Sequence, residues 1–144
     1  MTAIDPPASD AAATDLIRGA MPLCATLDMR SAAAGPDEVV VAVDWAEALC
    51  TSGGLLHGGV LMTLADSAGA TCAFLNLPDG ATGTTTLESK TNFLGAVRSG
   101  TATATARPLH VGSTTIVIET VVHDGDGRLV AKVTQTQMVL RPRS

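Results

Sequence analysis

A histidine and two glycines, His57-Gly58-Gly59, stand immediately before a long apolar run that contains a single acid, Asp66. Glycines at the start of a helix leave the first backbone N–H groups open to a ligand oxygen. An acid within an apolar helix is costly unless it is paired or used. Together these residues predict a backbone-amide pocket for an oxygen, with a carboxylate nearby.

These residue types could act on a polarised carbonyl. In a dry site, a backbone N–H at a helix start stabilises a developing oxyanion, and losing one such donor raises the barrier by about 3 kcal/mol. Gly58 would let a ligand approach its N–H closely because glycine has no side chain. A tight turn at Gly58 and an Asp66 that hydrogen-bonds a neighbouring strand would explain the same residues without chemistry.

The residues around Asp66 are mostly small. At 3.6 residues per turn, one helix face groups the acid with Gly59, Met62, Thr63, Gly69, Ala70 and Ala73. Gly69 is unfavourable in a helix interior, which indicates a close approach by another group. We therefore expect this face to meet a ligand or another backbone.

Other nucleophiles, bases and metal ligands are less well placed in the sequence. We predict that His57, just before the turn, shapes the loop with Gly59 and is not a general base. Ser67 and Thr63 flank the acid, but the GxSxG elbow of a Ser-His-Asp hydrolase is absent. The histidines lack metal-ligand spacing, and Cys24, Cys50 and Cys72 contain no CxxC pair. We expect neither a metal nor a cofactor, and reduced thiols.

Composition narrows the functional class. The chain has 144 residues, 46% of them hydrophobic, which fits one domain with a full core. A net charge of −5, with one Trp, two Phe and no Tyr, argues against nucleic acid as the main partner. Asp66 interrupts the longest apolar run, and the N-terminus lacks the features of a secretory signal. We expect a cytoplasmic protein without a membrane span.

Periodicity predicts an α+β domain over residues 14–144, preceded by a flexible tail over 1–13. A central helix over 58–75 is apolar nearly all round, which is typical of a buried helix, so the sheet would curl around it. The other expected elements are a helix over 15–21 broken by Pro22, strands over 23–31 and 38–45, and an antiparallel meander over 84–94, 101–109, 113–123 and 129–140.

With this order of elements, the chain resembles a hotdog-fold acyl-CoA thioesterase of the phenylacetate-degradation type, within the 4-hydroxybenzoyl-CoA thioesterase superfamily. The resemblance implies one long buried helix wrapped by a curved antiparallel sheet of about five to six strands. It is carried by Leu56-His57-Gly58-Gly59, Leu64-Ala65-Asp66, Leu87-Glu88, Asn92-Phe93-Leu94, Val97-Arg98-Ser99-Gly100, residues 110–115 and residues 126–131.

The resemblance also implies an activity, the hydrolysis of an acyl- or aryl-CoA thioester to a free acid and CoA. By position, the Gly58 N–H would polarise the carbonyl, and Asp66 of the other subunit would be nucleophile or general base. Thr86 falls where relatives place a hydroxyl near the attacking water. A homodimer or a dimer of dimers, with active sites at the subunit interface, is implied as well.

The chain departs from its relatives at Thr51. Six residues before the histidine, relatives commonly carry Asn or Gln, often in Asn-Pro-x-Gly, whereas here Thr51 is followed by Ser52. A threonine can hydrogen-bond water or a carbonyl, but it is shorter and lacks the amide. Thr51 is therefore included among the catalytic candidates.

Substrate contacts are expected beside the acid and at basic residues. Met62, Thr63 and Ser67 would contact the substrate near Asp66. Basic side chains are the usual ligands of phosphates, although ordinary surface charge explains each of them as well. The candidates for the CoA phosphates are Lys90, Arg98 and Arg107, with Gly112 and Ser113 in a β-turn.

Two other functions fit parts of the sequence. A hotdog dehydratase or hydratase would pair a catalytic histidine with the acid in a motif order that is absent here. A non-catalytic acyl-CoA-binding or regulatory hotdog module is favoured by the missing amide at residue 51, but no DNA-binding helix pair is appended. Turnover of CoA esters distinguishes these classes.

Overall fold

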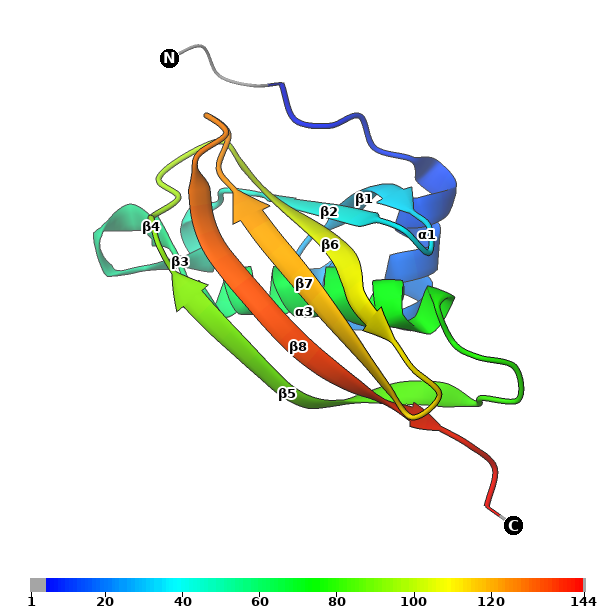
Figure 1. Cartoon of the computed structure of the whole chain (residues 1–144). Helices are drawn as coiled ribbons and strands as arrows, with labels where there is room; N and C mark the ends of the chain where they lie inside the picture. Colours follow the sequence, from blue (N-terminus) through cyan, green and yellow to red (C-terminus); the bar gives the residue numbers. More distant parts are fainter. Residues whose placement is uncertain (1–4, 144) are drawn as a thin grey trace.

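The computed structural model describes residues 5–143. One long helix, α3 (Gly58–Leu75), crosses one face of a six-stranded, curved antiparallel sheet (Figure 1). This arrangement confirms the hotdog fold. The sheet order is β1-β2-β6-β7-β8-β5, with β1 (Arg30–Ala34), β2 (Val39–Asp44), β5 (Gly83–Phe93), β6 (Thr101–Val111), β7 (Thr115–His123) and β8 (Leu129–Leu140).

The strand order corrects the predicted meander. Of the four strands in that meander, only β6, β7 and β8 follow one another as neighbours, whereas β5 pairs with the outer side of β8 and β6 lies beside β2. The loop over 94–100 connects β5 to β6 past the β8 end, where the N–H groups of Leu94 and Gly95 both donate to Val130 O. Alternation within each strand could not show this order, because it depends on pairing between distant segments.

The N-terminal expectations are corrected as well. Helix α1 begins at Ala11, inside the predicted tail, because the Asp10 side chain accepts a hydrogen bond from Ala13 N at 2.7 Å and caps it. Residues 1–4 of that tail lie outside the described residues. Pro22 ends α1 (Ala11–Ala20) but starts α2 (Pro22–Thr26), since proline is tolerated in the first turn of a helix.

This second helix occupies the region predicted as a strand over 23–31. The first strand, β1, therefore begins only at Arg30. The backbone of Asp10 donates to Ser31 O at 2.8 Å, so the start of α1 is attached to the edge of the sheet.

A short hairpin fixes the chain just before α3. It consists of η1 (Glu47–Leu49), β3 (Cys50–Thr51), η2 (Ser52–Gly54) and β4 (Leu55–Leu56). Gly53 has a φ of 78°, in the region that favours glycine, and allows the tight turn between the two strands. Trp45 Nε1 donates to Gly54 O at 3.0 Å, and Leu56 N donates to Val97 O at 2.9 Å. These contacts set where α3 starts.

Helix α3 has the predicted bounds, and its buried side forms the centre of the core. Leu61, Leu64, Ala65, Ala68 and Cys72 are almost inaccessible to solvent and follow helical spacing. The opposite side is not covered by the chain, since Met62, Asp66 and Phe74 are exposed. The expectation of a helix buried all round is therefore only half met.

The length of α3 corrects one step of the reasoning about membrane spans, namely that Asp66 makes the apolar run too short. Its 18 residues are long and apolar enough for a span, even with Asp66 in the middle, and it is the one such helix among residues 5–143. Half of the helix is buried against the sheet. These contacts identify α3 as the core helix of the domain.

Strand β5 is an open edge of the sheet. Most of its 11 residues are exposed, although β8 pairs with it along its length. Leu87 and Phe93 are 56% and 51% exposed, and Met62 on the uncovered side of α3 is 42% exposed. A long edge strand with apolar neighbours is a template for pairing with another chain.

An ion pair between β1 and β2, together with a hydroxyl hydrogen bond from β6, connects these three strands near the hairpin. Arg30 donates two hydrogen bonds to Asp44, at 2.8 and 2.9 Å, and the Thr101 hydroxyl donates to Asp44 at 2.6 Å. The Arg30 guanidinium, with the Thr101 hydroxyl, holds the pKa of the Asp44 carboxyl below its usual range. A carboxylate with a lowered pKa stabilises the fold above its unfolded pKa, and the contribution disappears as the pH falls through the folded pKa.

We therefore predict that Asp44→Asn lowers Tm at pH 7 by roughly 3 °C, since exposed bidentate pairs contribute about 1 kcal/mol. The difference from wild type should shrink as the pH falls below about 4. Thermal melts followed by circular dichroism between pH 3 and 7 measure it. A difference that is constant over this range would contradict the role of the ion pair.

Candidate active site

The N-terminus of α3 presents an N–H group for a ligand. His57 is the N-cap: its Nδ1 accepts from Gly59 N at 2.8 Å, while Val60 N donates to His57 O at 2.9 Å. The Gly58 N–H has no acceptor within residues 5–143. An oxygen placed there would meet both this N–H and the positive end of the helix dipole.

Neighbouring side chains lie close to both glycines of this turn. A Cβ on Gly58 would lie 3.2 Å from the Phe93 ring, and a Cβ on Gly59 would lie 2.9 Å from His57 Nδ1. Phe93, at the end of β5, therefore packs directly on the helix start. Neither glycine has a positive φ, so close packing rather than backbone conformation favours glycine at these positions.

Asp66 lies on the uncovered side of α3, eight residues after Gly58. At 1.5 Å per residue, the two positions are about 12 Å apart along the helix axis. The carboxylate accepts a hydrogen bond at 3.2 Å from Gln135 Nε2 on β8. Within one chain, the Gly58 N–H and the Asp66 carboxylate are too far apart to act on the same carbonyl group.

A second amide on β8 supports Thr86. Gln137 Nε2 donates to Thr86 Oγ1 at 2.8 Å, and the two residues are paired across β8 and β5. Gln135 and Gln137 are 0% and 1% exposed, at inward positions of β8 that Val133 and Val139 also occupy. The sequence reasoning missed both glutamines. The available signal was two polar residues at alternate positions of an otherwise apolar strand face.

The remaining catalytic and substrate candidates near α3 are divided between its two sides. Thr51 is exposed in the hairpin before the helix, and Met62 is exposed one turn before Asp66. The Thr63 hydroxyl donates to Gly59 O at 2.8 Å. Ser67 is 5% exposed, donates to Thr63 O and accepts from Cys24 Sγ, so it faces the core and not the Asp66 side.

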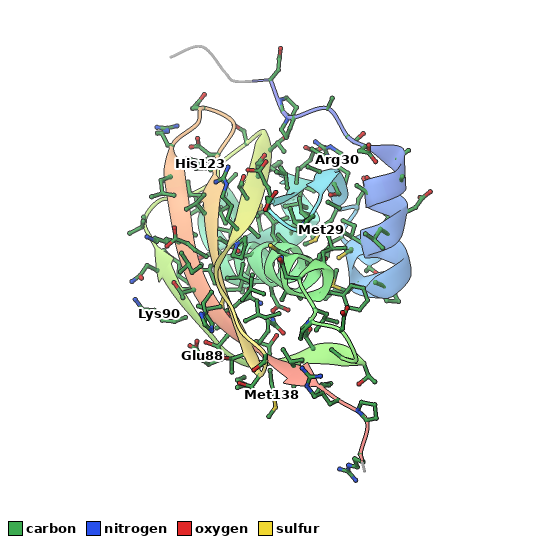
Figure 2. All side chains as sticks on the ribbon, turned by 45° about the vertical axis from the view of Figure 1, so that its right-hand side comes forward. Met29, Arg30, Glu88, Lys90, His123 and Met138 are labelled. Carbon is green, nitrogen blue, oxygen red and sulfur yellow. The ribbon has the colours of Figure 1, made fainter. Side chains whose placement is uncertain are left out.

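The candidates for CoA phosphates do not form one cluster. Arg98 precedes β6, whereas Gly112 and Ser113 follow it, so they lie at opposite ends of an 11-residue strand. Lys90 lies on the outer face of β5 (Figure 2) and donates to Asn92 Oδ1 at 2.6 Å. Arg107 is paired with Glu38. A single protomer cannot offer all of these residues to one phosphate.

Arg98 does border a hollow. The hollow has a volume of about 770 Å³ and lies between the loop over 94–100 and the β7–β8 turn. Its other cation, Arg128, is bound to Asp124 and Asp126, while Arg98 forms no ion pair in the described part of the chain. Arg98 is therefore the more available of the two for an anionic ligand.

A smaller, apolar hollow lies beyond Asp66, toward the C-terminal half of α3 and away from Gly58. It has a volume of about 330 Å³ between α1 and the second half of α3, lined by Leu16, Ala20, Met21, Ala70, Thr71, Phe74, Gly83 and Thr84. Ala70 is one turn beyond Asp66 on the same side of the helix. The acid thus lies between the helix start and an apolar space.

The cysteines are poorly suited to nucleophilic chemistry. Cys24 and Cys72 are buried, and burial raises the pKa of the Cys72 thiol to about 11, which keeps it protonated at neutral pH. Cys50 is half-buried and its thiol donates to Ala46 O. Among residues 5–143, no three His, Cys, Asp or Glu side chains gather closely enough to hold a metal ion.

An open amide at a helix start and an acid on the same helix are groups that a hydrolase acting on carbonyl groups could use. Residues 53–131, more than half of the chain, match the thioesterase superfamily. The chain therefore belongs to the thioesterase superfamily, and it is a thioester hydrolase.

Individual relatives agree with this assignment. A candidate esterase of Saccharolobus solfataricus is 38% identical over 104 residues, which are 72% of this chain and 73% of the relative. The 1,4-dihydroxy-2-naphthoyl-CoA hydrolase of Escherichia coli is 33% identical over 87 residues, 60% of this chain and 63% of that enzyme. The matched segments thus span about two thirds of these relatives' own length.

Solved structures agree over more of the chain. A thioesterase family protein from Silicibacter pomeroyi superposes with a TM-score of 0.83 at 28% identity, over 92% of this chain and 98% of that one. A mutant of thioesterase PA1618 from Pseudomonas aeruginosa gives 0.81 at 26% identity, over 88% and 93%. These likenesses concern the superfamily, and the phenylacetate-degradation type stays a prediction.

The capping contact of His57 gives a testable expectation. Asparagine is a strong N-cap residue, so His57→Asn should keep the Tm near that of wild type and retain partial activity. His57→Ala removes the cap and should lower the free energy of unfolding by about 1 kcal/mol. Thermal melts and thioester turnover of both variants measure these effects. Complete loss of turnover in a His57→Asn protein with a wild-type melt would show that the imidazole takes part in the reaction.

Proposed function

We propose that this protein hydrolyses an acyl- or aryl-CoA thioester to a free acid and CoA. The observation that carries the proposal is the pair of groups on α3: a Gly58 N–H without an acceptor in the described chain, and an exposed Asp66 carboxylate. The E. coli relative is named as an aroyl-CoA hydrolase, which supports CoA thioesters as the substrate class. No cofactor or metal takes part in the proposed reaction.

In this reaction, the Gly58 N–H donates to the thioester carbonyl oxygen and stabilises the negative charge that develops there. Asp66 then acts in one of two ways. As a general base, it takes a proton from a water that attacks the carbonyl carbon; as a nucleophile, it forms an anhydride that water hydrolyses. Either route breaks the C–S bond, and the CoA thiolate leaves and takes up a proton.

We further propose that each active site is built from two protomers. About 12 Å of helix separates Gly58 from Asp66, so a carbonyl bound at Gly58 needs the acid of a second chain. The open edge of β5, with Leu87, Phe93 and the neighbouring Met62 exposed, offers the surface for that chain. The assembly is a homodimer or a dimer of dimers.

The other candidates have supporting roles in the proposal. Thr86, held by Gln137, and Thr51, in the hairpin before α3, would hydrogen-bond the attacking water or the carbonyl. The apolar hollow beyond Asp66 would take the acyl or aryl group, because an apolar group gains by leaving water. Arg98 would bind a CoA phosphate, with Lys90 or the Gly112-Ser113 turn contributing where protomers meet.

The role of Asp66 is tested with acetyl-, hexanoyl-, palmitoyl- and benzoyl-CoA by thiol release. Asp66→Asn, which is nearly isosteric, should lower kcat by at least about 100-fold on the best ester, with little change in Tm. Asp79→Asn, an exposed acid in the loop after α3, is the matched control and should behave as wild type. Full activity in a folded Asp66→Asn protein would contradict the assignment, and tight binding of an ester without turnover by wild type would favour a binding module.

The two-protomer site is tested by mixing inactive variants. Gly58→Pro removes the N–H at a helix position where proline is accepted, and Gly58→Ala is its control, with the same crowding of Phe93 but the N–H kept. Gly58→Pro and Asp66→Asn should each be inactive. Equal amounts, refolded together, should recover about a quarter of wild-type turnover, because half of random dimers carry one intact site. Mixtures that stay inactive, although native mass spectrometry shows mixed dimers, would place the site within one protomer.

A further inference from the structure

One buried side chain is unexplained by packing. Gln135 is fully buried on the inward face of β8, where the alternate positions Val133 and Val139 are apolar. Its Nε2 donates to Asp66 Oδ1 at 3.2 Å, while its Oε1 has no hydrogen-bond partner among the described residues. A buried amide oxygen without a partner destabilises a fold, so an apolar residue would serve the core better.

Gly69 is a second residue that weakens the fold on its own. It lies inside α3, where glycine weakens a helix relative to alanine. A Cβ on Gly69 would lie only 2.3 Å from Gln135 Oε1 and 2.6 Å from Gln135 Cδ. The missing side chain therefore creates the space that the Gln135 amide fills. The close approach that the sequence indicated at this glycine is made by the amide group, not by another backbone.

Gln135 and Gly69 together bring an N–H group from the core to Asp66 on α3. Asp66 is exposed, and Gln135 is the one described residue that hydrogen-bonds its side chain. A carboxylate held at Oδ1 keeps one rotamer and leaves Oδ2 for the solvent side of the helix. When a reacting group is already fixed in its productive geometry, less entropy is lost on reaching the transition state.

We propose that Gln135 is a positioning residue for Asp66, and that Gly69 is retained in α3 to admit its amide. The inference rests on the proposed role of Asp66 in hydrolysis. Gln135 does not touch the substrate. It acts by donating Nε2–H to Oδ1, so its removal slows turnover while substrate binding stays intact.

The first test is Gln135→Met, assayed with the fastest of the four CoA esters. Methionine matches glutamine in length, fills the same space and lacks the N–H donor. We expect kcat to fall about tenfold with KM within about twofold of wild type, and Tm unchanged or higher. The matched control is Thr120→Val: Thr120 is buried on the neighbouring strand β7, with an unpartnered Oγ1, and does not hydrogen-bond Asp66. This control should keep wild-type kcat and KM.

A second variant keeps the test decisive if Gln135→Met does not fold. Gly69→Ala displaces the amide from Asp66 and should lower both Tm and kcat, and the Tm loss should disappear in the Gln135→Ala background, where the space is free. Wild-type kcat in folded Gln135→Met, or in Gly69→Ala, would overturn the inference. A fall in kcat together with an equal rise in KM would also overturn it, since that pattern indicates a binding role.

The Asp66→Asn background separates this inference from the function on which it rests. If Asp66→Asn lowers kcat by about 100-fold, adding Gln135→Met should cause no further loss of the residual turnover, because both changes act on the same group. A further loss would show that Gln135 acts independently of Asp66. If Asp66→Asn alone retains full activity, the proposed role of Asp66 fails first, irrespective of the result at Gln135.

Discussion

The packing of α3 on the sheet is the constraint on which the rest of the molecule depends. Its buried side, with Leu64 and Ala68 inaccessible to solvent, fixes the position and rotation of the helix. That rotation decides that Asp66 lies on the uncovered side, and the helix start places the Gly58 N–H at the end nearest the hairpin. One rigid element therefore forms the core and carries both candidate catalytic groups, and elements of regular structure hold such groups more precisely than loops do.

The same geometry limits what one chain can do alone. A helix rises by about 1.5 Å per residue, so two groups eight residues apart cannot bracket one carbonyl. The exposed edge of β5 and its apolar neighbours offer a physical solution, since pairing with a second chain would cover this surface. The proposed catalytic geometry and the surface chemistry thus support the proposed second protomer by separate arguments.

Buried amides on β8 form the supporting layer. Gln135 and Gln137 occupy positions that a purely structural core would fill with apolar residues, and each donates to a candidate catalytic side chain. Gly69 weakens the helix yet makes room for one of them. Such departures from good local packing are expected where function requires a fixed polar group.

Helix α3 could be predicted from the sequence alone, because its signals are local: the His-Gly-Gly start, the apolar run, and Pro78 after its end all lie close to the residues that they affect. The last strand, over 129–140, was also predicted correctly, whereas the pairing of Gly58 with Asp66 stays a prediction. The sequence reasoning missed the cap at Asp10 and misplaced the first strand, since Pro22 can begin a helix as well as end one. The place of β5 at the open edge, and the contact between Gln135 and Asp66, are visible only in the folded chain. These facts depend on pairing between residues far apart in the chain, which no periodicity within one segment specifies.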